Sequence, residues 1–174
     1  MIKRNRVILV TIGLLVAAIA VLAFINQGGA DRRRTLQEDR QFLLKLDGEV
    51  AATAGLQDLM GLQPEEFTTR LAAGGAMPRD TVLQGVELRL IYEHFGIDMS
   101  GATVFIVRGL DGYASAVRPA EVMAEDTIYI CIRMDGNLLE GKGAGGWGPF
   151  LMAVRGSRFA QRWCKYVEEV DARR

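Results

Sequence analysis

The stretch "LEGKGAGGWGPFLMAV", residues 139–154, decides between two kinds of fold. Five of its residues are glycine, and Gly141, Gly143 and Gly146 fit the G-x-G-x-x-G pattern of dinucleotide-binding loops. Such a loop must follow a strand and open a helix, because the helix N-terminus supplies part of the phosphate site. Here Trp147-Gly148-Pro149 and another β-rich run follow instead. The stretch is therefore predicted to connect two strands and to bind no nucleotide.

The runs on both sides of this stretch predict an α+β domain, with helices early and strands late. After Gly101, β-rich runs alternate with Asp-Gly, glycine-rich and Gly-Ser turns, and "RPAEVMAED" between the first two is a brief helix or turn. Earlier, "QFLLKLDGEV" reads as a strand that ends at a turn. Helices are expected in "GLQDLMGLQPEEFTTRL", with a second one beginning at Pro64, and in "LQGVELRLIYEHFGI", which ends at Gly96.

The N-terminus predicts a membrane anchor. Val7–Ile25 is an apolar run of 19 residues without a charge, and about 20 helical residues span the hydrocarbon core of a bilayer. The run is longer than the apolar part of most signal peptides, which favours an uncleaved signal-anchor over a cleaved signal. Cleavage remains the alternative, since Gly28 and Ala30 have the spacing of small residues at a cleavage site.

Charges around the anchor predict its orientation. A short basic tail before the span stays in the cytoplasm as a rule, so the rest of the chain should be exported, although three arginines follow the span. We therefore expect a single-pass protein of the cell membrane with an extracytoplasmic C-terminal domain. The expected divisions are residues 1–30 as anchor, 31–40 as juxtamembrane spacer and 41–174 as the α+β domain.

Composition excludes some functions and leaves others open. The chain has 21 basic and 21 acidic residues, without the clustered basic surface that nucleic-acid binding requires. Two cysteines are too few for a disulfide scaffold. Strand alternation places Cys131 and Cys164 on partly polar faces, so a single disulfide between them stays open. The only histidine is His94, so neither a zinc site nor a hydrolytic triad is predicted.

The order of short motifs from about residue 42 to 171 resembles the molybdopterin-binding domain of the sulfite oxidase family. The resemblance implies that "LDGEV" is the opening strand and "LQGVELRLIYEHFGI" the helix of that domain. The other matching segments, in order along the chain, are Asp111-Gly112-Tyr113, Met134-Asp135-Gly136-Asn137-Leu138-Leu139, Gly146-Trp147-Gly148-Pro149-Phe150-Leu151 and Arg162-Trp163-Cys164-Lys165-Tyr166-Val167.

The resemblance also implies a cysteine thiolate that binds molybdenum, located between the opening strand and the helix. In this chain the corresponding interval, residues 51–84, contains no cysteine. Its only basic residues are Arg70 and Arg79. The expectation is that the scaffold is kept and the metal site is lost, so no cofactor and no metal are expected. If a cofactor does bind, the candidate contacts are Arg70, Arg79, Asp111 and Tyr113.

Two functional hypotheses follow from these observations. The first is a membrane-anchored binding or accessory module, held in the bilayer through residues 7–25, with an unknown protein or small-molecule partner and no enzymatic activity. The alternative is a molybdopterin-dependent oxidoreductase or electron-transfer subunit with an atypical cofactor site. No catalytic residue is assigned, because Asp111 and Asp135 each precede a glycine and are explained as turn formers.

Overall fold

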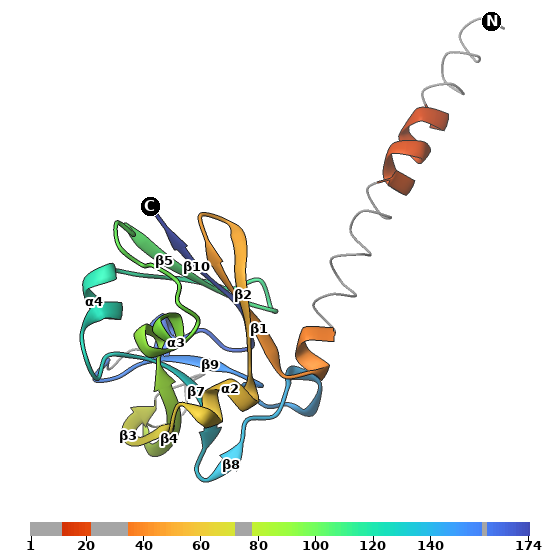
Figure 1. The fold of residues 1–174 in the computed structure, drawn as a ribbon. Coiled ribbons are helices and arrows are strands. Elements are labelled where there is room, and N and C mark those ends of the chain that lie inside the picture. Colours follow the sequence, from red (N-terminus) through yellow and green to blue (C-terminus); the bar gives the residue numbers. More distant parts are fainter. Residues whose placement is uncertain (1–11, 22–34, 72–77, 158–159) are drawn as a thin grey trace, which may run out of the picture. The chain divides into compact units, whose positions relative to one another are not determined.

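The computed structural model describes residues 12–21, 35–71, 78–157 and 160–174 (Figure 1). The chain divides into two compact units, Met1–Thr35 and Leu36–Arg174.

In the first unit, residues 12–21 form a helix whose ten residues are all apolar and all exposed. Within the described ranges, no helix is both long enough and apolar enough to cross a membrane. The predicted span over residues 7–25 extends at both ends into residues 1–11 and 22–34, which lie outside those ranges. The anchor therefore stays a prediction.

The second unit contains two five-stranded sheets. The first sheet places the last strand in its middle, where β10 is parallel to β1 and antiparallel to β5. All its other pairs are antiparallel. Its strands, in spatial order, are β2 (Glu49–Gly55), β1 (Gln41–Leu46), β10 (Val167–Arg173), β5 (Val104–Gly109) and β6 (Ala114–Val117).

The second sheet is antiparallel throughout and is centred on β7, which pairs with three strands. The sequence of β7, "IYICIRM", is buried at its first five positions, as expected for an apolar strand covered on both faces. The strands of this sheet are β3 (Glu65–Leu71), β4 (Arg79–Glu87), β7 (Ile128–Met134), β8 (Asn137–Leu138) and β9 (Leu151–Val154).

The helices are short, and α3 packs against both sheets in the interior (Figure 1). Its Tyr92 is fully buried, and the hydroxyl donates a hydrogen bond to the Val170 carbonyl of β10 (2.9 Å). The Tyr92 ring meets the Phe105 ring of β5 edge to face at 5.7 Å. A helical turn over residues 35–38 precedes β1. The labelled helical elements of this unit are α2 (Leu56–Gly61), α3 (Leu88–His94), α4 (Pro119–Met123) and the short 3-10 helices η1 (Lys142–Ala144) and η2 (Ala160–Arg162).

Aromatic packing closes the core between the sheets. Phe42 of β1 and Phe150, which precedes β9, are both fully buried, with ring centroids 4.8 Å apart in an edge-to-face arrangement. Truncating a buried phenylalanine to alanine typically costs about 3–5 kcal/mol, so contacts of this kind hold the two sheets together.

The mixed α and β content agrees with the predicted class, but the predicted order of helices before strands is wrong. The strands β1 to β4 all precede residue 88. Pro64-Glu65-Glu66 leads into strand β3 and not into a helix. In β3 the residues Phe67, Thr69 and Leu71 alternate inward with period two, because the strand pairs with β4 along its whole length.

Other local predictions are confirmed. "LQGVELRLIYEHFGI" does contain a helix, but the strand β4 continues to Glu87 before α3 begins. Gly96, with φ of 63°, follows the end of α3 as expected of a left-handed C-terminal residue. In the stretch 139–154, residues 139–150 connect β8 to β9 through η1, and the glycine-rich loop is followed by the strand β9.

A bulge in β7, opposite Gln84 and Gly85 of β4, generates the first testable prediction. The β4–β7 register shifts at Gly85, where an added Cβ would lie 2.6 Å from the Ile130 carbonyl oxygen. We expect Gly85→Ala to lower the free energy of unfolding by about 1–3 kcal/mol, since the backbone of β7 must move. Chemical denaturation of the full-length chain measures this change.

The matched control is Gly61→Ala in α2, where a Cβ meets nothing within 4 Å. Alanine is favoured over glycine in a helix, so this variant should gain up to about 1 kcal/mol. Equal stabilities for the two variants would contradict the tight packing of β4 on β7.

Candidate functional site

A surface pocket of about 280 Å³ lies in the second unit, between the turn that joins β5 to β6 and the segment that leads into β10. One wall comes from the turn and the other from residues about fifty positions later. The side chains that line the pocket are Asp111, Tyr113, Gln161, Trp163 and Lys165.

The first wall is a tight turn. The Gly109 N–H donates to the Tyr113 carbonyl (2.9 Å), and Gly112 has a φ of 85°, which glycine adopts without strain. The Asp111 carboxylate accepts a hydrogen bond from the Tyr113 backbone N–H (3.1 Å). Asp111 therefore stabilises the turn, as predicted, and its side chain also lines the pocket.

The second wall is an extended segment held beside β9. Cys164 and Met152 exchange both backbone hydrogen bonds, at 2.8 and 3.0 Å. This pairing holds Cys164 in the core. Its chain neighbours Trp163 and Lys165 line the pocket.

The two walls are joined by hydrogen bonds. The Tyr113 hydroxyl donates to the Gln161 carbonyl, and the Ser115 hydroxyl donates to the Arg162 carbonyl (2.8 Å). Gly109 sets how closely the walls approach, because a Cβ there would collide with the Lys165 carbonyl oxygen.

Lys165 is the pocket's cation. Burial lowers the pKa of its ammonium, and the nearby Asp111 carboxylate partly raises it again. The ammonium lies 3.5 Å from the centroid of the Trp147 ring, a cation–π contact with the glycine-rich stretch.

Two features near Lys165 are uncommon in a packed domain. Trp163 is only 4% exposed, yet its indole N–H has no hydrogen-bond acceptor. Buried polar groups of this kind are nearly always paired. Tyr166 has a φ of 55°, which is rare for a bulky side chain. Backbone strain of this kind clusters at functional sites, so it marks the segment as a candidate.

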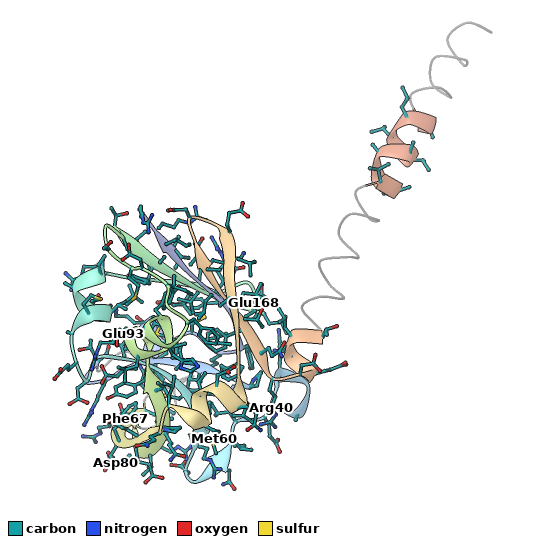
Figure 2. The ribbon with its side chains drawn as sticks, in the orientation of Figure 1. Arg40, Met60, Phe67, Asp80, Glu93 and Glu168 are labelled. Carbon is teal, nitrogen blue, oxygen red and sulfur yellow. The ribbon has the colours of Figure 1, made fainter. Side chains whose placement is uncertain are left out.

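The structure brings together two of the four predicted contact residues. Asp111 and Tyr113 line the pocket. Arg70 and Arg79 lie on the β3–β4 hairpin of the other sheet, where Arg70 is opposite Asp80 in the register. In Figure 2, Asp80 marks this hairpin. Glu168, the second residue of β10, marks the end of the segment that forms the second wall of the pocket, and the two labelled residues are well apart in the view. Arg79 forms an ion pair with Asp135 instead (3.5 Å).

Sequence reasoning missed Gln161, Trp163 and Lys165. The β-rich composition of the run from Arg162 to Val167 predicts a strand, in which a core position is the ordinary place for Trp163. Trp163 is indeed buried, but β10 begins only at Val167. In an extended chain, side chains alternate with period two, so the sequence "RWCKY" places Trp163 and Lys165 on the same side. The sequence does not show that the turn with Asp111 and Tyr113 lies opposite that side, because this contact is formed in the tertiary structure.

The thiols lie elsewhere than predicted. Cys131 and Cys164 are both fully buried in the core, so the prediction of partly polar faces is wrong. For Cys131 the error arises because β7 is covered on both faces, and Cys164 is buried where it pairs with Met152 of β9. The two thiols are free, without a disulfide between them. Burial raises the pKa of both, that of Cys164 to about 12.

Comparisons with known proteins identify the fold. No protein-family model matches the chain, and no curated protein matches it. Among solved structures, it is similar to the crystal structure of the sulfane dehydrogenase SoxCD from Paracoccus pantotrophus, with a TM-score of 0.62 and 15% sequence identity. The match covers 79% of this chain but only 39% of that structure's chain.

This similarity supports a distant sulfite-oxidase-like fold, as the motif order predicted. At 15% identity it establishes the fold alone.

An ion pair beside the pocket generates a second prediction. Glu121 of α4 accepts hydrogen bonds from the Arg118 guanidinium (3.2 Å) and from that of Arg162 (2.8 Å), which precedes Trp163. Burial raises the pKa of Glu121, but these two hydrogen bonds, a third from the Arg118 backbone N–H and the charge of Arg162 together outweigh that effect and lower the pKa to about 2. A lowered pKa stabilises the fold above the unfolded value of about 4.3, and this contribution disappears as pH falls towards 2.

We expect Glu121→Gln to reduce the free energy of unfolding at pH 7 by about 1–2 kcal/mol. The difference from wild type should shrink as the pH is lowered from about 4 towards 2. Urea denaturation at several pH values measures it, with the exposed Glu125→Gln as control. A pH-independent difference, or none relative to Glu125→Gln, would count against the ion pair.

Proposed function

We propose that this chain is a membrane-anchored, extracytoplasmic binding or accessory module, built on a sulfite-oxidase-like fold without a molybdenum centre. The observation that carries the proposal is the enclosure of both thiols in the core. The pocket lined by Asp111, Tyr113, Gln161, Trp163 and Lys165 is its binding site.

The residues present do not fit a thiolate-bound metal. A metal ligand must be the thiolate, and burial disfavours that form in both Cys131 and Cys164. The interval 51–84, where the family resemblance expects the ligand, contains no cysteine. In the described ranges, no three histidine, cysteine or acidic side chains are grouped as a metal site requires.

The N-terminal helix supports the anchor. All ten residues from 12 to 21 are apolar and exposed, so the helix has no polar face to turn to water. The apolar sequence continues in both directions, from Val7 to Ile25. A bilayer would cover this surface completely.

The alternative function is a molybdopterin-dependent oxidoreductase or electron-transfer subunit. One observation favours it, namely the fold shared with an enzyme described as a sulfane dehydrogenase. It requires a cofactor site that uses neither cysteine.

Metal analysis separates these two functions. We expect the full-length chain, expressed in a host that makes the pterin cofactor, to purify with far less than one molybdenum per chain. Its melting temperature should be the same with and without molybdate, because no cofactor is expected to bind. A bound cofactor at a hundredfold excess over Kd would raise the free energy of unfolding by about 2.7 kcal/mol, and the melting temperature would rise with it. A molybdenum enzyme expressed in parallel confirms loading. Stoichiometric molybdenum in this protein would establish the alternative.

Membrane extraction tests the anchor. We expect the wild-type chain to remain in the membrane pellet after alkaline carbonate washing. Leu15→Arg combined with Ile19→Arg should release it, since an arginine near the centre of a membrane helix costs about 2.5–3.5 kcal/mol. The matched control, Leu15→Ala with Ile19→Ala, should remain bound. Recovery of the wild type in the soluble fraction would contradict the anchor.

A further inference from the structure

We propose that the pocket binds the zwitterionic head group of a small neutral amino acid. The ligand carboxylate would be held by Lys165, and the ligand ammonium by Asp111. The inference rests on the proposed function, in which this pocket and not a metal is the working site.

One side of the pocket offers hydrogen-bond donors. The Lys165 ammonium has three N–H donors, while its ring partner Trp147 supplies only a π face. An incoming carboxylate would supply the acceptor that Lys165 needs.

The other side offers acceptors. One Asp111 oxygen accepts the Tyr113 backbone N–H, which leaves lone pairs on the carboxylate for another donor. The Tyr113 hydroxyl has already given its hydrogen to the Gln161 carbonyl, so its oxygen is also able to accept. An ammonium group provides the donors that this side lacks.

The two charges of the pocket are near each other but not paired. The Asp111 charge raises the pKa of Lys165, yet no ion pair of 4.0 Å or less joins them in the described part of the chain. A ligand that carries an ammonium and a carboxylate on the same carbon atom complements this arrangement. A simple anion would be attracted to Lys165 and repelled by Asp111.

The size of the pocket limits the ligand. At about 280 Å³ the pocket is slightly smaller than the roughly 300–1,000 Å³ of typical small-molecule sites, which favours a ligand with few non-hydrogen atoms, such as leucine. The exposed side chain of Tyr113 lines the pocket and offers a ring against which an apolar side chain can pack.

The test is calorimetric titration of the molybdenum-free, full-length chain in detergent with each neutral L-amino acid. The tightest binder is then compared with its two single-charge analogues, which for leucine are 3-methylbutylamine and 4-methylpentanoate. We expect at least one amino acid to bind with a Kd below about 1 mM, and each analogue to bind at least about tenfold more weakly.

Matched variants locate the site. Lys165→Met and Asp111→Asn should each weaken binding by about tenfold or more. Lys142→Met and Asp80→Asn, both exposed and outside the pocket, should bind as wild type does. Melting curves check that every variant is folded.

Three outcomes would overturn the inference: no amino acid binds, the carboxylate-only analogue binds equally well, or Lys165→Met and Asp111→Asn bind as wild type does. These failures differ from failure of the proposed function, which appears as stoichiometric molybdenum. A molybdenum-free chain that binds no amino acid would refute the ligand class and leave the binding-module proposal in place.

Discussion

The last fifteen residues of the domain link its two sheets, and the rest of the structure depends on that link. Cys164 pairs with Met152 beside β9, and three residues later the Val167 N–H donates to the Phe150 carbonyl (3.0 Å). The chain then enters the middle of the other sheet as β10, between β1 and β5. One continuous segment thus completes a core and builds a pocket wall, so core packing and site geometry are determined together.

The sequence predicted those turns and helices that are determined by patterns of a few neighbouring residues. The turn at Asp47-Gly48, the helix α2 and the end of α3 at Gly96 belong to this group. The strand β3 could not be predicted in this way. Pro64-Glu65-Glu66 is also a good helix start, and the strand forms because β4 offers a complete antiparallel partner.

The candidate site shows the same division. Asp111 and Tyr113 belong to a short motif, so sequence reasoning named them and the structure places them in the pocket. Lys165 and Trp163 join them only through pairing across about fifty residues, which no local pattern encodes. The cysteines were misplaced for a related reason. The alternation argument assumes that each strand has one solvent-exposed face, while Cys131 lies on β7, which is buried on both faces at this position.

The central position of β10 also constrains the order in which the domain folds. Its contact with β1 is formed by residues such as Lys45 and Glu169, which are 124 positions apart. Non-local strand pairing of this kind makes folding slow. While the chain is being synthesised, β1 has one edge without a partner until residues 167–173 have emerged. An unpaired edge invites pairing with other chains, so the nascent domain needs shielding during that interval.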